Sequence, residues 1–250
     1  DPLLVRAGRG LVATPRAVEL RERVAQLVQG ADEVLRPLQA PNLREVECLF
    51  TLRTSDGFVE TFGPGLVARV SEEAPGVHFS FVQKWNKESA LLRTGMVDLE
   101  TGIVDENASP ELMTQFLFQD HYVGVVRADH PLCRGKITLT RYLAAKHISV
   151  SRKGSDKGPV DAALAAVDAE RTAAVIVSGF SASLGLARMT DLVASVPKRH
   201  TESLRAGMHT FVLPFPVPTF SISMMWHPRL HADPVHRWLR GCLREVCAGR

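Results

Sequence analysis

From residue 48 onward, short apolar runs alternate with segments of helical periodicity, and few folds accommodate that order. Residues 48–53 and 77–82 have the length and apolar alternation of strands, and a helix is predicted between them over residues 58–70. A short helix over residues 90–93 and a strand over residues 98–104 follow. This βαβαβ order predicts an α/β fold with a parallel sheet.

The same order recurs in a second segment, so two α/β units are expected. Its predicted strands and helices cover residues 116–127, 139–145, 148–151, 159–167, 173–177, 181–188, 192–196 and 198–205. Residues 209–225 then return as strands, and residues 226–250 end as an amphipathic helix. A chain that leaves one unit and later returns to it builds two lobes with a cleft between them, where a small ligand can bind.

A long helix precedes these two units. Thr14-Pro15 is a strong start signal, because the threonine oxygen can accept from a free backbone N–H and proline suits the first helical position. Apolar residues then recur at alternating steps of three and four, at Ala17, Leu20, Val24, Leu27, Ala31, Val34 and Leu38. This heptad spacing predicts dimerisation through Leu20, Val24, Leu27, Ala31 and Val34. The alternative is that the helix packs against its own domain.

Composition and charge exclude several classes of protein. Hydrophobic residues make up 45% of the 250, which is typical of a globular chain and too many for a disordered one. The net charge of +3 permits an anionic partner but is too small for a protein that coats nucleic acid. The four cysteines form no C-x-x-C pair, which favours a reducing cytoplasm. Neither export nor membrane insertion is expected, because the chain shows no signal segment and no apolar run of about 18 residues.

Three motifs resemble a dinucleotide-binding, a catalytic and a metal-binding site, but the surrounding sequence argues against each. Residues 63–68 fit G-x-G-x-x-A, but they lie inside a helical pattern rather than after a strand. Residues 179–183 lack the closing glycine of a nucleophile elbow. His227, His231 and His236 do not have the spacing of a metal-binding pair and are expected at the surface. No cofactor, metal ion or catalytic residue is therefore expected.

A basic, glycine-containing turn over residues 5–10 opens the chain. Its two arginines, Arg6 and Arg9, are candidates for contacts with the phosphates of DNA. The alternative is an ordinary solvated loop, because short basic loops at a protein surface are common.

Five further motifs follow in order: Gly95-x-x-Asp98-Leu99, His130-Pro131-Leu132, residues 191–197, Trp226-His227, and Asp233-Pro234-x-His236-Arg237-Trp238. With the opening turn and helix, their order and spacing resemble those of the LysR-type transcriptional regulators over almost the whole chain. The resemblance implies a two-lobed, periplasmic-binding-protein-like effector domain preceded by a long linker helix. The implied parts are a wing remnant of a winged helix-turn-helix at 1–13, a linker and dimerisation helix at 14–40, lobe I at 47–115 plus 219–250, and lobe II at 121–210. The DNA-reading helices are then expected to precede Asp1.

The resemblance also implies an effector site between the lobes, at Thr54, Ser55, Asp56, Trp85, Asn86, Ser155, Lys157, Gly158, Phe180 and Ser181. Thr54 and Ser55 precede a helix, whose free N–H groups and dipole favour an anion, although helix capping explains both equally well. Asp56 repels a carboxylate and suits a cap, or an amine or hydroxyl of the ligand, so the charge of the ligand stays open. Trp85 suits stacking on an aromatic ligand or packing within its own lobe. Loop 152–158 is basic and suits an acidic ligand, a cover over the cleft or plain solvation.

The leading hypothesis is the effector-sensing and oligomerising part of a bacterial, cytoplasmic transcription regulator without catalytic activity. A small-molecule effector would shift the population of lobe arrangements and thereby the assembly of a homodimer or homotetramer. Promoter DNA would be bound by the full-length protein only. Two alternatives stay open: a free-standing solute-binding protein without DNA binding, and an α/β enzyme, which would need a paired acid, base or nucleophile in the cleft.

Overall fold

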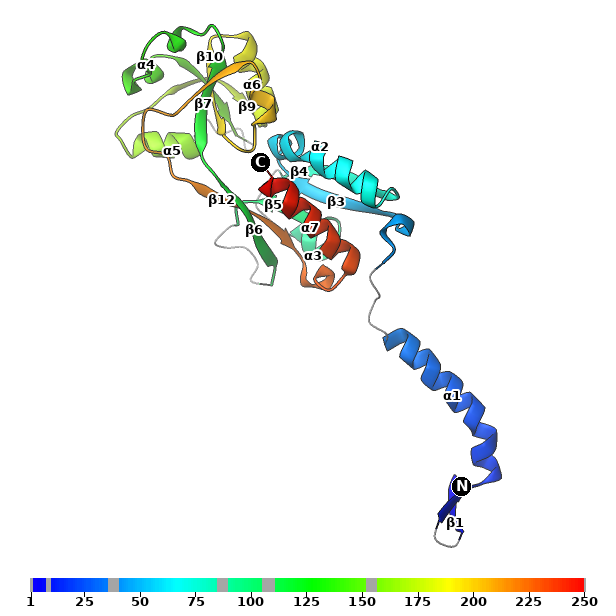
Figure 1. Ribbon diagram of the computed structural model, residues 1–250. Coiled ribbons are helices and arrows are strands. Elements are labelled where there is room, and N and C mark those ends of the chain that lie inside the picture. The colour runs from blue at the N-terminus through cyan, green and yellow to red at the C-terminus, as the bar shows by residue number, and fades with distance from the viewer. Residues whose placement is uncertain are drawn as a thin grey trace. The chain divides into compact units, whose positions relative to one another are not determined.

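The computed structural model describes residues 2–7, 10–35, 41–84, 90–104, 111–151 and 157–249. The chain divides into two compact units, Asp1–Pro41 and Asn42–Arg250 (Figure 1). Among the described residues, no helix is both long and apolar enough to cross a membrane.

The N-terminal unit begins with a hairpin of two strands. β1 (Leu4–Ala7) pairs antiparallel with β2 (Gly10–Ala13), and Val5 lies opposite Val12. The predicted turn over residues 5–10 is therefore largely strand, because valine favours the extended backbone of a paired strand. Arg6 lies exposed on β1, and Arg9 lies outside the described residues.

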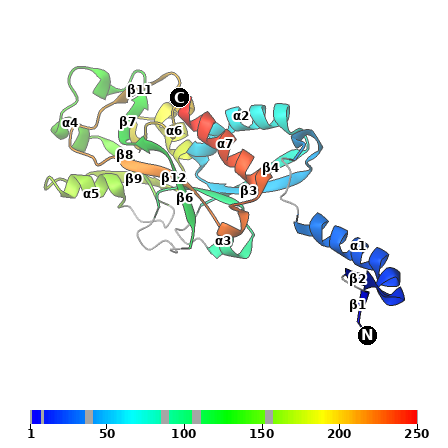
Figure 2. The same cartoon turned by 60° about the horizontal axis from the view of Figure 1, so that its bottom comes forward.

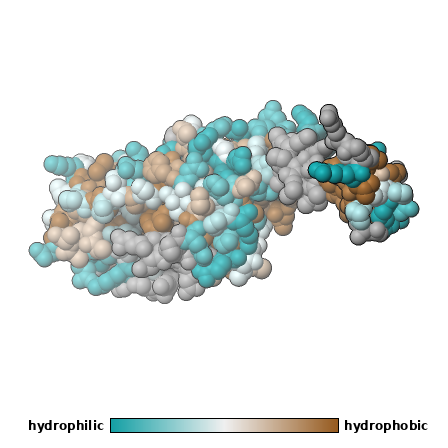
Figure 3. All heavy atoms as spheres, turned by 90° about the horizontal axis from the view of Figure 1, so that it is seen from below, coloured by the Kyte–Doolittle hydropathy of each residue, from teal (hydrophilic) through white to brown (hydrophobic). Residues whose placement is uncertain are grey.

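α1 (Pro15–Leu35) begins where the Thr14-Pro15 signal predicts it. Thr14 Oγ1 accepts a hydrogen bond from Ala17 N at 3.3 Å, which caps the first turn. Val24 and Leu27 are 51% and 74% exposed, and Figure 3 shows apolar side chains on the surface of this unit. By itself, the unit leaves these apolar side chains of α1 uncovered.

The second unit contains two five-stranded sheets, and the first has the strand order β4-β3-β5-β12-β6. Its strands are β3 (Cys48–Thr54), β4 (Val77–Gln83), β5 (Leu99–Gly102), β6 (Met113–Asp120) and β12 (Phe220–Trp226). β3 runs parallel to β4 and β5, whereas β12 runs antiparallel to β5 and β6. The predicted parallel arrangement is confirmed for β3, β4 and β5. β12, for which no direction was predicted, is antiparallel to β5, because the chain returns from the second sheet and enters this one from the opposite end.

The second sheet has the strand order β11-β7-β10-β8-β9. Its strands are β7 (Tyr122–Arg127), β8 (Lys146–Val150), β9 (Thr172–Val177), β10 (Leu192–Pro197) and β11 (Met208–Phe211). β8 is parallel to β9 and β10, and β7 is antiparallel to β10 and β11. The helices α4 (Leu139–Leu143), α5 (Pro159–Ala165) and α6 (Phe180–Met189) connect these strands. We call this sheet with its helices lobe II.

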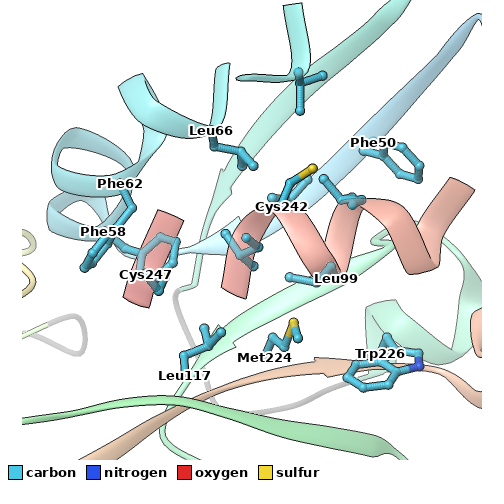
Figure 4. Close-up of a cluster of buried hydrophobic side chains, with 14 of the residues drawn as sticks. Phe50, Phe58, Phe62, Leu66, Leu99, Leu117, Met224, Trp226, Cys242 and Cys247 are labelled. Carbon is cyan, nitrogen blue, oxygen red and sulfur yellow. The ribbon is translucent and has the colours of Figure 1, made fainter. Parts of the chain in front are cut away.

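Lobe I is the first sheet with α2 (Asp56–Glu73), α3 (Ala90–Thr94) and α7 (Pro234–Ala248). α2 and α7 pack on one face of its sheet, and Figure 4 shows the side chains buried between them. Those from the helices include Phe58, Phe62, Leu66, Cys242 and Cys247. Because these side chains are buried against the sheet, the hydrophobic effect fixes the position at which α2 begins, at the edge of the cavity described below.

The chain crosses between the lobes twice (Figure 2). β6 ends at Asp120 and β7 begins at Tyr122, so the predicted strand stretch of residues 116–127 is two strands in different sheets. Residues 212–219 form the second crossing, between β11 and β12.

The predicted helix over residues 198–205 is wrong, because a single 3-10 turn at Ser203–Arg205 forms there. The physical reason lies at the crossing, where Asp120 accepts the backbone N–H groups of Arg199 at 2.9 Å and His200 at 3.0 Å. Those contacts hold the segment in a loop. The C-terminal helix likewise begins at Pro234 rather than at residue 226, which still belongs to β12.

Candidate functional site

A cavity of about 490 Å³ lies between the lobes, where loops at the strand ends of both sheets meet. Lobe I contributes the start of α2 and the end of β5, and lobe II contributes the ends of β8 and β10 and the start of α6. The crossing strands add Tyr122 and Phe220. This size falls within the roughly 300–1,000 Å³ of small-molecule sites.

The wall of the cavity combines apolar surface with hydroxyl groups. Its apolar and aromatic members include Ile103, Tyr122, Val150, Phe180, Pro197, Phe220 and Ile222. Its hydroxyl groups belong to Ser55, Thr101, Ser149, Ser151, Ser178 and Ser195. A compact, largely apolar molecule with a few hydrogen-bonding groups matches such a wall.

Five of the residues predicted for the effector site line this cavity, namely Ser55, Asp56, Lys157, Gly158 and Phe180. Thr54 lies on a smaller hollow of about 250 Å³ beside it, which Ser55 and Asp56 also line. Ser181 is one residue beyond Phe180 and contacts Asp56. Trp85, Asn86 and Ser155 lie outside the described residues.

The hydroxyl groups of Thr54 and Ser55 are both engaged with the protein itself. Ser55 Oγ accepts from Phe58 N at 3.3 Å and so caps α2. Thr54 Oγ1 is hydrogen-bonded to Thr101 Oγ1 and links β3 to β5. Capping, the simpler of the two interpretations of this segment, thus accounts for the position of Ser55.

Asp56 caps a helix of the other lobe. Its Oδ2 accepts a hydrogen bond of 2.9 Å from Ser181 N, in the first turn of α6. The N-cap residue of α6 is Gly179, which has no side chain to cap with. Ser181 Oγ in turn donates to a carboxylate oxygen of Glu60, one turn further along α2. Two carboxylates of lobe I therefore contact one residue of lobe II.

A buried cluster of charges lies at the lobe I side of the cavity. Glu100 pairs with Arg53 through Oε1 and Nη1 at 2.6 Å, and with Lys84 through Oε2 and Nζ at 2.9 Å. All three side chains are less than a tenth exposed, and Lys84 also lines the cavity. Removing one partner would leave a buried charge unpaired, which is strongly destabilising. The cluster therefore ties β3, β5 and the end of β4 together.

A second charge pair forms the lobe II wall. Arg171 contacts both carboxylate oxygens of Asp161, at 2.6 and 3.0 Å, and Arg171 Nη1 lies 3.3 Å from Ser195 Oγ. Asp161 Oδ2 also accepts from Gly158 N at 2.8 Å, at the start of α5. Burial opposes ionisation of Asp161, but the hydrogen bonds and charge of Arg171 outweigh it and hold the pKa of this carboxyl below its ordinary value.

Asp120 organises the first crossing between the lobes. Besides Arg199 N and His200 N, its carboxylate accepts from His121 N at 2.8 Å and lies 3.0 Å from His200 Nδ1. Burial acts against the charged form, but the contacts with His200 and the backbone donors keep the pKa of Asp120 low. His200 lines the cavity, so these hydrogen bonds at the first crossing between the lobes extend to the candidate site.

In the described part of the chain, no group of three or more His, Cys, Asp or Glu side chains could hold a metal ion. The expectation that all three C-terminal histidines lie at the surface is wrong for His236, which is fully buried. Its Nε2 lies 3.1 Å from the carbonyl oxygen of Asp98, and burial lowers its pKa. The histidine has a structural role, joining α7 to the residue before β5.

Sequence reasoning missed Lys84, Asp161, Arg171 and His200 as cavity residues. Asp161 carried a usable signal, because an acidic residue three positions after Gly158 is typical of a capping box at a helix start. The other three had none, since a single lysine, arginine or histidine after a strand or in a loop is common in any protein. Their positions follow from tertiary packing alone.

In the comparison with protein families, residues 45–248 match the LysR substrate binding domain. Among curated proteins, the HTH-type transcriptional activator NahR of Pseudomonas putida is 32% identical, over 98% of this chain and 83% of that protein. NagR of a Ralstonia species, another transcriptional activator of the same type, is 28% identical over 98% of this chain and 82% of its own length.

Solved structures agree with these matches. The probable transcriptional regulator PA0477 from Pseudomonas aeruginosa superposes with a TM-score of 0.73 at 28% identity, covering 97% of this chain and 82% of that one. The regulatory domain of MexT, a transcriptional activator of the same bacterium, gives a TM-score of 0.69 at 27% identity, covering 80% of this chain and all of that domain. The similarity thus includes both lobes.

Proposed function

Because this chain belongs to the LysR family of transcriptional regulators, we propose that the cavity between its lobes binds a small-molecule effector that alters the protein's action on promoter DNA. The chain is the effector-sensing part of a regulator, not an enzyme and not a free solute-binding protein. One observation carries the proposal: a ligand-sized cavity lies inside the segment that matches the substrate-binding domain.

The proposed effector site comprises the residues expected from the sequence together with those that the cavity adds. Ser55, Asp56, Lys157, Gly158 and Phe180 support it by lining the cavity. Thr54 and Ser181 support it by direct contacts with that wall. We keep Trp85, Asn86 and Ser155 in the proposal on the family resemblance, and add Lys84, Arg171, Ser195 and His200 on their position.

We propose that α1 mediates homodimer or homotetramer formation. Val24 and Leu27 support this, because each is more than half exposed in the single chain and both share one heptad stripe with the half-buried Leu20. The side chains of Ala31 and Val34 lie outside the described residues and enter only through the sequence pattern. A partner α1 would bury this stripe.

The remaining assignments are proposals of the same kind. Residues 1–13 would be the wing, with Arg6 and Arg9 on the DNA backbone, and residues 14–40 the linker helix. Lobe I would span 47–115 plus 219–250, and lobe II 121–210. The membership of the strands in two sheets supports this division, except that β6 extends lobe I to Asp120. Because promoter DNA is the target, the site of action would be the cytoplasm of a bacterial cell.

The proposed mechanism is a population shift. The lobes are proposed to exchange between two arrangements, and an effector that binds one of them more tightly raises the population of that arrangement. The size of the shift is set by the difference between the effector's affinities for the two arrangements. The crossing at Asp120 and the contacts between α2 and α6 are where the lobes can respond. A changed dimer geometry then reaches the DNA through α1.

A mobility-shift assay with the full-length gene product on its own upstream DNA tests the proposal. We expect a shift that a pool of small metabolites alters, and we expect Ser178→Trp, which fills the exposed rim of the cavity, to lose that effect but keep the DNA shift. Ser71→Trp, on the exposed outer part of α2, is the matched control and should respond like the wild type. If Ser178→Trp responds to metabolites as the wild type does, the effector binds elsewhere.

A further inference from the structure

The start of α2 lies directly against lobe II. Besides the contacts of Asp56 and Glu60 with Ser181, Thr61 Oγ1 donates to the carbonyl oxygen of His200 at 2.9 Å. Ser203 Oγ donates to the carbonyl oxygen of Glu60 at 3.1 Å. The first two turns of α2 therefore contact lobe II at the start of α6 and at residues 200–203, beside the cavity.

Two glycines allow this close approach. A Cβ atom at Gly179 would lie 2.3 Å from Asp56 Oδ2, and one at Gly57 would lie 2.9 Å from the carbonyl oxygen of His200. Real side chains do not tolerate such distances. The sequence is thus adapted to place the Asp56 carboxylate at the first turn of α6.

The first turn of α6 is suited to a negative charge. α6 has ten residues, and its first N–H groups carry the partial positive charge of the helix end. Asp56 supplies that negative charge from the other lobe, through Oδ2 on Ser181 N. An incoming carboxylate would therefore find this helix end already occupied by an anion.

Asp56 faces the cavity as well as the helix. It lines the cavity between the lobes, and within the described part of the chain its Oδ1 has no hydrogen-bond partner. A carboxylate with one oxygen committed and the other available accepts a donor and repels an anion. Asp56 can therefore both accept a hydrogen bond from a ligand and repel an anionic ligand at the same corner of the cavity.

We propose that Asp56 determines which chemical group of the effector binds beside α6: a hydrogen-bond donor such as an ammonium or hydroxyl group binds there, and a carboxylate is excluded. This inference rests on the proposed effector function of the cavity. It assigns Asp56 a role in specificity that its contact with Ser181 alone does not require. Any carboxylate on the effector must then lie at another part of the wall.

Two small probes of opposite charge test this with the whole chain. Acetate and methylammonium are titrated into ¹⁵N-labelled wild type, Asp56→Ala and Asp56→Asn, and the Ser181 and Gly57 amide signals are followed. Asp56→Asn keeps the side-chain shape and an acceptor oxygen but removes the charge. Glu72→Ala removes an exposed carboxylate near the end of α2 and is the matched control.

We expect acetate to move the Ser181 signal in Asp56→Ala at about tenfold lower concentration than in the wild type, equivalent to about 1.4 kcal/mol. Methylammonium should move both signals in the wild type and in Glu72→Ala, and should lose about tenfold in affinity in Asp56→Asn. The proposal is overturned if acetate acts equally on wild type and Asp56→Ala, or if methylammonium does not distinguish Asp56→Asn from the wild type. Either result leaves the effector function intact, because that depends on the metabolite response of the DNA shift.

Discussion

Arg171 and Asp161 form an ion pair in the lobe II wall of the cavity. Both side chains are largely buried, 4% and 15% exposed, so neither charge is well solvated without the other. Neutralising Asp161 leaves the guanidinium in a poorly solvated position. The same reasoning applies to Glu100, which pairs with two cations on the opposite wall.

We predict that Asp161→Asn lowers the free energy of unfolding by about 2–4 kcal/mol at pH 7. The pKa of Asp161 is lowered in the folded chain, whereas an unfolded aspartate titrates at about 3.9. The stability from the ionised pair is therefore complete above that unfolded value and is lost as the pH falls through the folded pKa. Urea unfolding at several pH values should show the difference from the wild type shrinking below about pH 4.

The matched control for this prediction is Asp129→Asn, an exposed carboxylate of the same lobe, which should change stability little at any pH. A wild-type advantage over Asp161→Asn that stays constant from neutral to acid pH would show that the ion pair is not its source.

At the residue level, the sequence predicted that Asp56 would repel a carboxylate ligand, but not that its carboxylate contacts Ser181 of the other lobe. A carboxylate directly after Ser55, at the start of a helix, stands out in the sequence. Its partner Ser181 is 125 residues away, and no local pattern links the two. Positions of this kind depend on how two lobes meet, which periodicity does not encode.

At the level of elements, periodicity predicted which segments form strands and helices better than it predicted their direction. The apolar spacing at Phe58, Phe62 and Leu66 predicted α2, and these residues are buried in the structure. The antiparallel course of β7 and β12 was missed, because an apolar run has the same appearance in either direction. The helix predicted over residues 198–205 failed since Asp120, far away in sequence, accepts the N–H groups of Arg199 and His200.

Strand packing in lobe II gives a prediction at this scale. Gly124 on β7 lies opposite Phe211 on β11, and a Cβ atom at Gly124 would be 2.2 Å from the Phe211 ring. Gly124→Ala should displace that buried ring and lower the free energy of unfolding by about 1–3 kcal/mol. Gly185→Ala is the control, because nothing lies within 4 Å of its added methyl and alanine favours a helix. Urea unfolding that ranks Gly124→Ala as stable as Gly185→Ala would contradict the packing argument.

For the whole molecule, chain order and the family resemblance predicted the two-lobed fold. A chain that leaves one α/β unit and later re-enters it leaves few alternatives to two lobes. The cavity itself required the structure, because its wall combines residues as distant as Ser55 and Ser195. The effector's identity depends on the shape of that wall, which cannot be predicted directly from the sequence.

The assembly of the molecule gives a further prediction. Val24→Lys places a charge in the heptad stripe of α1 and should convert the proposed oligomer into smaller species, because a buried, unpaired ammonium is costly. Val18→Lys is the matched control, since Val18 is similarly exposed but lies outside the heptad positions. Light scattering coupled to size-exclusion chromatography measures both masses. Equal masses for the two variants would mean that α1 does not join the subunits through this stripe.

Native mass spectrometry of the chain after incubation with a bacterial small-molecule extract tests the central claim most directly, namely that the cavity between the lobes binds an effector. We expect the wild type and Ser71→Trp to retain one small molecule per chain, and Ser178→Trp to retain none. Retention of the same molecule by Ser178→Trp, or retention by none of the three proteins, would contradict an effector site in this cavity.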